Sequence, residues 1–228
     1  MKVSVIIPVY NERGTIAELL QRVLAVPVEK EVLVVDDFSQ DGTRDLLPPL
    51  AVPPVHLLLH DRNRGKGAAV RTALAHVTGE IVILQDADLE YDPAEYPRLI
   101  EPIALGTADV VYGSRFLGHG HRASSRGHYL ANQVLTRLSN LFTGLRLSDM
   151  ETCYKAFRAD LLLSLPLESN GFDIEPELTA RAARRKARFI EVPISYQGRS
   201  AREGKKIGWR DGVRALWAIA RFGLWKRN

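Results

Sequence analysis

The architecture follows from residues 3–37, which read VSVIIPVYNERGTIAELLQRVLAVPVEKEVLVVDD. Two runs rich in Val and Ile, 3–9 and 31–35, are typical of buried strands. The segment between them, 15–24, repeats apolar residues at helical spacing. A strand, a helix and a second strand joined by short connections predict a right-handed crossover in a mostly parallel sheet.

The same alternation continues along the chain. We expect further strands at 55–59, 81–84 and 110–112, and further helices at 66–76 and 94–103. Helices cover both faces of buried parallel strands, so the sequence predicts an α/β fold with a mostly parallel central sheet. In such sheets ligands bind at the carboxyl ends of the strands.

The second half of the chain is less regular. Strands are expected at 153–158 and 189–192, and helices at 129–142, 174–184 and 208–222. We therefore expect these later elements to extend the same sheet and to cover it.

Two segments rich in glycine and basic residues, 118–127 and 198–206, are expected to be loops. Gly198 and Gly204 would allow the second loop to order over a bound ligand. Neither a repeat nor a linker is visible, so we expect a single domain over residues 1–228.

Length and composition exclude several classes of protein. The 228 residues suffice for a full core, and the hydrophobic (46%) and charged (25%) shares exclude a disordered or fibrous chain. A single cysteine, Cys153, excludes an internal disulfide and indicates a reducing compartment. No signal peptide is visible and no apolar run approaches the roughly 20 residues of a membrane span, so we expect a cytoplasmic protein.

The net charge of +4 conceals an uneven distribution. Residues 181–228 hold 14 Lys and Arg against 3 Asp and Glu, whereas residues 1–180 hold 17 against 24. A basic tail on an acidic body suggests an anionic partner, although a solvated basic face has the same composition. The tail contains no recognisable nucleic-acid motif, so we expect no nucleic-acid partner.

The clearest chemical signal is Asp86-Ala87-Asp88, directly after the expected strand at 81–84. Two carboxylates one residue apart can present oxygens to one hard cation, and Mg²⁺ is commonly held by one or two carboxylates together with substrate phosphates. Glu90 is a candidate third ligand. A polar turn is the alternative, but two other acidic strand ends at the same edge favour a metal site.

Polar groups also follow the first two strands. Tyr10 and Glu12 come after the first, and Asp37 comes after the second. Asp37 can accept hydrogen bonds from a nucleobase or a ribose and Tyr10 can pack on a base, while Asp41 is assigned to helix capping. Asn63–Gly67 lacks the Gly-x-x-x-x-Gly-Lys-Ser/Thr spacing of a phosphate loop. No Gly-x-Gly-x-x-Gly follows the first strand, which argues against a dinucleotide cofactor.

Five motifs occur in order along the chain: Pro8-Val-Tyr-Asn-Glu12, Asp36-Asp-Phe-Ser-Gln-Asp-Gly-Thr43, Asn63-Arg-Gly-Lys-Gly67, Asp86-Ala-Asp88 and Gly113-Ser-Arg-Phe116. Together they resemble family 2 glycosyltransferases with the GT-A fold, and more narrowly the dolichyl-phosphate mannose synthase and polyprenyl-phosphate hexose synthase branch. The resemblance spans nearly the whole chain. It implies inverting transfer of a hexose from a nucleotide-diphosphate sugar, with Mg²⁺ or Mn²⁺ on the diphosphate.

The resemblance also implies roles for individual residues. The nucleoside would be bound by Pro8, Tyr10, Glu12, Val35 and Asp37. The sugar and the metal would be bound by Asp86, Ala87, Asp88 and Glu90. Arg115 and Arg126 would meet the acceptor phosphate, and Arg199 and Lys206 would close over the donor diphosphate. Residues 1–113 would then form the nucleotide-sugar half and residues 114–228 the acceptor half.

The residues themselves leave the acceptor open. A dolichyl or undecaprenyl phosphate is already anionic, so it needs cations such as arginine rather than a strong base. A saccharide or small-molecule hydroxyl would need a carboxylate base, for which Asp149 and Glu151 are the candidates. With a phosphate acceptor these two would orient the sugar or the arginines. A nucleotidyltransferase and a non-catalytic nucleotide-sugar-binding module are more distant alternatives.

The last expected helix bears on location. It combines arginines with apolar residues including Trp209 and Trp217. Such a helix can lie on an anionic membrane surface, or its apolar side can pack on the domain. A polyprenyl phosphate acceptor would imply peripheral contact with the inner face of the membrane. The oligomeric state is left open.

Overall fold

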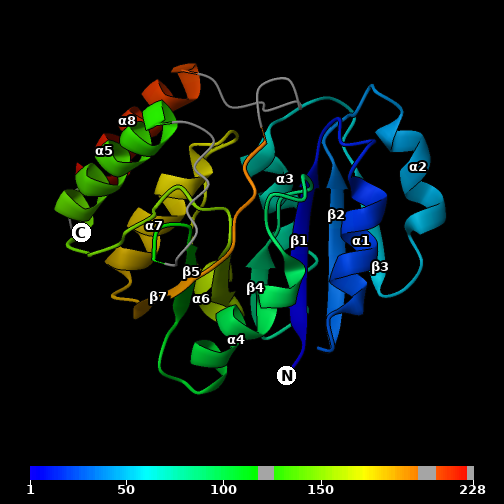
Figure 1. Ribbon diagram of the computed structural model, residues 1–228, viewed down its shortest axis with the longest axis horizontal. Helices are drawn as coiled ribbons and strands as arrows, with labels where there is room; N and C mark the ends of the chain where they lie inside the picture. The colour runs from blue at the N-terminus through cyan, green and yellow to red at the C-terminus, as the bar shows by residue number, and fades with distance from the viewer. Residues whose placement is uncertain (118–125, 200–208, 225–228) are drawn as a thin grey trace.

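The computed structural model describes residues 1–117, 126–199 and 209–224. Within these ranges one seven-stranded sheet has the order β3-β2-β1-β4-β6-β5-β7 (Figure 1). The strands are β1 (Val3–Val9), β2 (Lys30–Asp36), β3 (Val55–Leu59), β4 (Ile81–Leu84), β5 (Val110–Ser114), β6 (Lys155–Arg158) and β7 (Phe189–Pro193). The expected α/β fold with a mostly parallel sheet is confirmed.

Helices cover both faces of this sheet. They are α1 (Ile16–Ala25), α2 (Thr43–Leu50), α3 (Lys66–Leu74), the 3-10 helix η1 (Pro93–Glu95), α4 (Tyr96–Ala104), α5 (Arg126–Thr143), α6 (Ala159–Leu163), α7 (Ile174–Arg184) and α8 (Trp209–Leu224). Adjacent β1 residues such as Val5 and Ile6 point to opposite faces, yet both are fully buried. Burial on both faces explains why the central strands read as continuous apolar runs.

One strand runs against the others. β6 is antiparallel to both of its neighbours, β4 and β5, whereas the remaining pairs are parallel. The chain therefore enters β6 at the edge where the parallel strands end. The turn at 147–154 that precedes β6 lies at that edge, beside the segments that follow β1, β2, β4 and β5.

The sequence analysis gave bounds for most elements but not for two short helices. The bounds expected for β1, β3, β4 and α7 match those observed. α2 is the helix whose start was assigned to Asp41, and it was given no bounds because Pro48 and Pro49 in its last turn interrupt the helical pattern. α6 has only five residues, too few to show a helical period. Most of the two expected loops, 118–127 and 198–206, lies outside the described residues.

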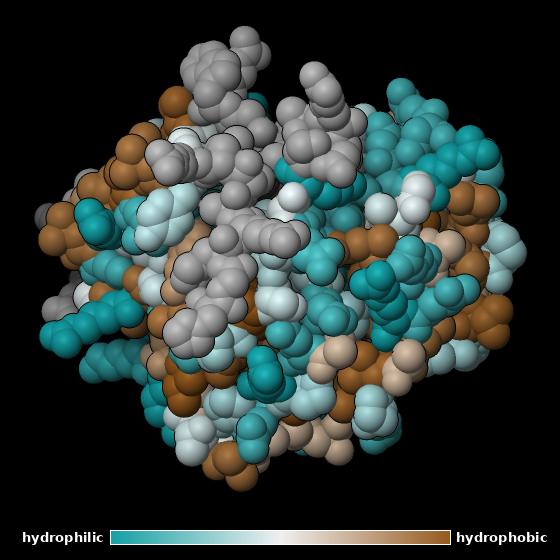
Figure 2. Space-filling model, in the orientation of Figure 1, coloured by the Kyte–Doolittle hydropathy of each residue, from teal (hydrophilic) through white to brown (hydrophobic). Residues whose placement is uncertain are grey.

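Three helices, α5, α7 and α8, pack against one another at one end of the molecule (Figure 1). The last helix uses its apolar side for this packing, since Ala215, Ala218, Ile219 and Phe222 are buried. Apolar side chains also gather on the outer surface over α5, at the left of Figure 2. Among the described helices, none has the length and apolar character needed to cross a bilayer.

Candidate active site

Asp86, immediately after β4, lies in a buried network of charges. Its Oδ1 is 2.7 Å from Nζ of Lys66, the first residue of α3, and the same Nζ is 2.9 Å from Oε1 of Glu175 on α7. Lys155, the first residue of β6, also pairs with Glu175. Burial alone would raise the pKa of Asp86, but the ammonium of Lys66 outweighs it and lowers that pKa. Asp86 is therefore ionised.

Asp88 lies in a more strongly acidic environment. Burial, together with the negative charges of Asp86 and Glu90, raises the pKa of Asp88 to about 7. Its Oδ2 is 3.2 Å from Nη2 of Arg199, which offsets part of this effect. The guanidinium of Arg199 also makes two hydrogen bonds of 3.0 Å to the carboxylate of Glu12. Arg199 thus supplies the positive charge between the segments after β1 and β4.

Glu90 holds the segment that carries Arg199. One carboxylate oxygen accepts a hydrogen bond from the Arg199 backbone N–H at 2.7 Å, and the other accepts one from the Tyr196 hydroxyl at 2.7 Å. The Glu90 carbonyl accepts a third from the Gln197 N–H at 3.0 Å. In this structure both oxygens are engaged with the segment at 196–199, so the role of Glu90 as a metal ligand stays a prediction.

The chemistry of this edge fits a divalent cation shared with a substrate. No group of three or more His, Cys, Asp or Glu side chains within the described ranges is arranged to hold a metal. Mg²⁺ and Mn²⁺ prefer oxygen ligands, and Mg²⁺ commonly takes one or two carboxylates with the rest from water and phosphate. Asp86 and Asp88 offer such oxygens, and the crowding that raises the pKa of Asp88 is a negative field that a cation would relieve.

Asp37 organises the loop before α3. Its carboxylate accepts hydrogen bonds of 2.7 Å from the backbone N–H groups of Arg64 and Gly65, and its Oδ1 lies 2.7 Å from Nδ1 of His60. This contact fixes the Asn63–Gly67 motif against the end of β2 and sets the position of Lys66. The nucleoside role expected of Asp37 stays a prediction.

The other expected nucleoside residues line the ends of β1 and β2. Pro8 and Val35 are register partners. Val35 is fully buried, so its side chain belongs to the core and any contact with a ligand is left to its backbone. Tyr10 is partly exposed just beyond β1.

Ala87, expected beside the sugar and the metal, accepts a hydrogen bond of 2.7 Å through its carbonyl from the Thr15 hydroxyl. This bond joins the segments after β1 and β4.

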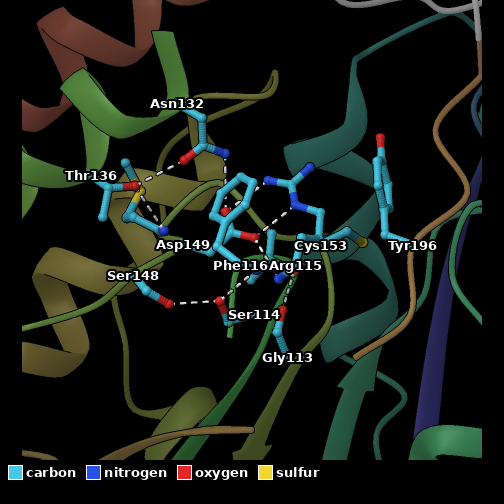
Figure 3. A network of polar contacts seen from close by, with 12 residues as sticks. Gly113, Ser114, Arg115, Phe116, Asn132, Thr136, Ser148, Asp149, Cys153 and Tyr196 are labelled. Atoms are coloured by element: carbon cyan, nitrogen blue, oxygen red, sulfur yellow. Dashed lines mark hydrogen bonds and ion pairs between the residues drawn. The ribbon is translucent and has the colours of Figure 1, made fainter. Parts of the chain in front are cut away.

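Arg115 and Asp149 form a buried ion pair (Figure 3). Arg115, just after β5, places Nε 2.7 Å from Oδ2 and Nη2 2.8 Å from Oδ1 of Asp149, in the turn before β6. Asn132 on α5 donates to the same carboxylate at 3.0 Å. Burial alone would raise the pKa of Asp149, but Arg115 lowers it. The guanidinium lies over the ring of Tyr196, which connects this pair to the segment carrying Arg199.

Glu151 differs from its neighbour Asp149. Its Oε1 is buried and has no hydrogen-bond partner among the described residues. Burial raises its pKa to about 7, with Glu175 and Asp149 adding to the effect and Lys155 opposing it. A pKa near 7 lets Glu151 exchange a proton around neutral pH, whereas both oxygens of Asp149 bind Arg115.

Three site residues were missed by sequence reasoning. Lys66 lies in a quoted motif but was given no role, and Lys155 and Glu175 were not singled out. The signal for Lys66 is its position between two glycines, Gly65 and Gly67. The signal for Glu175 is a glutamate on the apolar face of a helix. Two expected residues are not placed: Lys206 and the side chain of Arg126 lie outside the described residues.

The protein-family description "Glycosyl transferase family 2" matches residues 4–165, which include the site residues from Glu12 to Glu151. The chain belongs to glycosyl transferase family 2. This confirms the family resemblance of the five motifs and identifies the chain as a glycosyltransferase.

Curated relatives support the same branch of family 2. An undecaprenyl-phosphate mannosyltransferase of Micrococcus luteus is 34% identical over 239 residues, covering 98% of this chain and 95% of the relative. An undecaprenyl-phosphate 4-deoxy-4-formamido-L-arabinose transferase of Edwardsiella ictaluri is 33% identical, covering 89% of this chain and 62% of that protein. The chain spans between 51% and 63% of the length of this and three further relatives.

A solved structure confirms the GT-A fold of this family 2 member. Glucosyl-3-phosphoglycerate synthase from Mycobacterium tuberculosis, crystallised with Mn²⁺, UDP and phosphoglyceric acid, superposes with a TM-score of 0.76 at 19% identity. The superposition covers all of this chain and 80% of that one. Identity at this level shows the shared fold alone.

Proposed function

We propose that this family 2 enzyme transfers a hexose, with inversion, from a nucleotide-diphosphate sugar to a polyprenyl phosphate. The observation that carries the proposal is the Arg115–Asp149 pair. Both oxygens of the buried Asp149 bind Arg115, so this carboxylate holds a cation in place instead of serving as a base. A fixed arginine suits a phosphate acceptor, which needs orientation and charge compensation rather than deprotonation. The names of the curated relatives agree with this acceptor class.

The reaction follows from these positions. An oxygen of the acceptor phosphate, oriented by Arg115, attacks the anomeric carbon of the hexose from the face opposite the diphosphate. A carbon–oxygen bond forms as the bond to the diphosphate breaks, and the nucleoside diphosphate leaves with both electrons. Arg199 and Lys66 lie at the acidic edge of the sheet, where they would lower the cost of the negative charge on the leaving group.

We propose that Asp86 and Asp88 hold a divalent cation, Mg²⁺ or Mn²⁺, together with the donor diphosphate. When bound, this ion supplies positive charge to the leaving diphosphate. Arg199 now pairs with Asp88 and Glu12, and in the loaded enzyme it would exchange part of these contacts for phosphate oxygens.

Glu151 favours a second candidate, transfer to a saccharide or small-molecule hydroxyl. A hydroxyl acceptor needs a base whose pKa lies near the working pH. Burial raises the pKa of Glu151 to about 7, and its Oε1 has no partner among the described residues. Under this alternative the fold, the donor and the metal residues keep their roles.

The deciding experiment is a transfer screen with purified enzyme. GDP-mannose, UDP-glucose and related donors are each combined with Mg²⁺ or Mn²⁺, with and without a short, water-soluble polyprenyl phosphate, and the released nucleoside diphosphate is measured. Release that rises sharply with the lipid phosphate supports the synthase and identifies the donor. Release stimulated by a sugar but not by the lipid phosphate supports the second candidate.

Two variants and one control sharpen this screen. Arg115→Lys keeps the charge but loses the two-point contact, so transfer to the lipid phosphate should fall at least a hundredfold. Arg22→Lys, on the exposed surface of α1, is the matched control and should leave the rate unchanged. Glu151→Gln should abolish transfer only if the acceptor is a hydroxyl.

We further propose that the reaction takes place at the cytoplasmic face of a membrane. The cysteine Cys153 is buried and free, as fits a reducing compartment. The proposed acceptor is a lipid, so the enzyme would have to meet the bilayer from this side.

A further inference from the structure

His60 is a buried histidine near the nucleoside end of the candidate site. It follows β3, the strand at the edge of the sheet beside β2 (Figure 1). His60 is 4% exposed, whereas His56 on β3 and His76 after α3 are exposed. Burying a polar ring is costly unless its nitrogens find hydrogen-bond partners. The partners of His60 therefore indicate what the ring does.

The two ring nitrogens of His60 connect β2 to α3. Nδ1 lies 2.7 Å from Oδ1 of Asp37, directly after β2, and Nε2 lies 2.9 Å from Oγ1 of Thr72 on α3. Nδ1 donates to the carboxylate, and in the neutral ring Nε2 then accepts from the Thr72 hydroxyl. We define these two hydrogen bonds as the Thr72–His60–Asp37 chain. It fixes the orientation of the ring between a helix and a strand end.

The backbone of His60 is also held from two sides. Its N–H donates a hydrogen bond of 2.9 Å to the carbonyl of Asp36, the last residue of β2. Its carbonyl accepts one of 3.0 Å from Nη1 of Arg44 on α2. Contacts with β2, α2 and α3 thus set the position of the ring. His60 therefore presents its Nδ1 donor to Asp37 from a fixed place.

Asp37 is buried without a Lys or Arg partner. It is 3% exposed, and among the described residues its charge contact is with His60 alone. Three donors meet its carboxylate: the backbone N–H groups of Arg64 and Gly65, and the His60 ring. A carboxylate offers about four acceptor positions, so about one is left for a ligand. Asp37 can then accept a single further hydrogen bond.

The three donors differ in what they attach Asp37 to. Arg64 and Gly65 belong to the loop before α3, so their N–H groups hold the carboxylate to that loop. His60 holds it to Thr72, in the body of α3. Without the His60 donor, Asp37 would be bonded to the loop alone, and a buried carboxylate that has lost a donor gains by turning toward water.

We propose that His60 is a positioning residue for the donor nucleoside: backed by Thr72, its ring holds the Asp37 carboxylate where it accepts a hydrogen bond from the base or the ribose. This rests on the proposed function for its nucleotide donor and is independent of the acceptor. His60 itself touches no substrate. Its loss should therefore weaken donor binding and leave acceptor binding unchanged.

The first test titrates the full chain with UDP and with GDP, each with Mn²⁺, by calorimetry. His60→Leu removes both ring nitrogens and should raise the Kd of the bound nucleotide by about tenfold or more, the effect of one hydrogen bond to a charged group. His60→Asn keeps an N–H donor for Asp37 and should stay within about threefold of the wild type. His56→Leu, at the exposed histidine of β3, is the matched control and should bind like the wild type. In transfer assays His60→Leu should raise the KM for the donor but not that for the acceptor.

The second test needs no variant and therefore holds even if His60→Leu does not fold. In wild-type protein labelled with ¹⁵N-histidine, the His60 resonances should show a hydrogen on Nδ1 and should shift when the nucleotide is added. Resonances that do not move at saturating nucleotide would overturn the proposal, as would wild-type nucleotide affinity in a folded His60→Leu.

The same titrations separate this proposal from the proposed function. Nucleotide affinity that depends on His60, in an enzyme that never transfers to a lipid phosphate, would leave the role of His60 standing and remove the proposed acceptor. A wild type that binds neither UDP nor GDP would overturn both the role of His60 and the proposed donor.

Discussion

At the scale of single residues, Asp88 has the most unusual surroundings in the site. It is largely buried beside Asp86 and Glu90, and Arg199 is its cationic contact. An ionised carboxylate in such a place is costly for stability, and groups of this kind are concentrated at functional sites. Its position, directly after β4, is the one expected for a metal-binding carboxylate.

Asp88→Asn should lower donor turnover by two to four orders of magnitude while the protein stays folded. The amide keeps the shape but removes the charge that would hold the cation. Released nucleoside diphosphate and the thermal unfolding midpoint are the two measurements, and the midpoint should not fall because a repelling charge is lost. Asp92→Asn, at an exposed helix cap four residues away, should keep its turnover. Full activity of Asp88→Asn would remove this residue from the metal site.

Glu151 should make stability depend on pH. Folding raises its pKa from 4.5 to about 7, so the folded state binds more protons than the unfolded state between these values. Its contribution to the free energy of unfolding is then full below about pH 4.5 and is lost as pH rises to about 7. The shift corresponds to on the order of 3 kcal/mol.

Glu151→Gln removes this dependence. Denaturant unfolding from pH 4.5 to 8 should show the variant gaining stability relative to the wild type as pH rises, by up to about 3 kcal/mol. Parallel curves for the two proteins would mean that Glu151 is ionised in the folded state at neutral pH.

At the scale of elements, the Arg115–Asp149 pair is held by three of them. Asn132 of α5 bonds to the Asp149 carboxylate, while Glu191 of β7 accepts hydrogen bonds of 2.7 Å from the Ser148 N–H and 3.1 Å from the Asp149 N–H. The position of Arg115 thus depends on how β5, β7 and α5 pack.

Asp149→Asn should cost about 3 kcal/mol of stability, because it leaves the guanidinium of Arg115 buried without its counter-charge. It should also raise the KM for the acceptor more than that for the donor. Glu18→Gln breaks an exposed pair with Arg22 on α1 and should cost no more than about 0.5 kcal/mol. If Asp149→Asn and Glu18→Gln lose the same free energy of unfolding in urea, the Arg115–Asp149 pair contributes no more to stability than a surface pair.

Gly67 sets how closely α3 approaches the segment before α7. A Cβ at this position would overlap the backbone carbonyl of Ser169, whereas one at Gly14 would meet nothing within 4 Å. Gly67→Ala should therefore cost roughly 1–3 kcal/mol and lower turnover by displacing Lys66. Gly14→Ala should change stability by less than about 0.5 kcal/mol. Thermal unfolding of both variants checks the contrast.

The sequence predicted local features well and long-range contacts poorly. β1 and β4 were placed residue by residue because continuous Val and Ile runs end at clear turn residues. The antiparallel direction of β6 could not be read, since a four-residue strand has the same pattern either way. The contacts of Glu90 with Tyr196 and Arg199, more than 100 positions away, could not be read either. Lys66 was overlooked because its partners, Asp86 and Glu175, are distant from it in the sequence.

At the scale of the whole molecule, ligand binding should be visible as thermal stabilisation. A nucleoside diphosphate with Mn²⁺ at about 100 times its Kd should add roughly 2.7 kcal/mol, or about 5–10 °C in Tm for a domain of this size. Asp88→Asn should lose the metal-dependent part of this shift. A chelator alone should leave Tm unchanged, because Lys66 and Arg199 already face the carboxylates. Unfolding by the chelator would contradict this arrangement.

The place of β6 has a consequence for how the chain is made. β4 pairs with β1 on one side and with β6 on the other, and 70 residues separate Leu84 from Lys155. While a ribosome is still adding these residues, the apolar strand β4 has one edge with no neighbour. Open edges of this kind invite pairing with other chains. Until β6 has been made, this edge of β4 is therefore open to pairing with other chains.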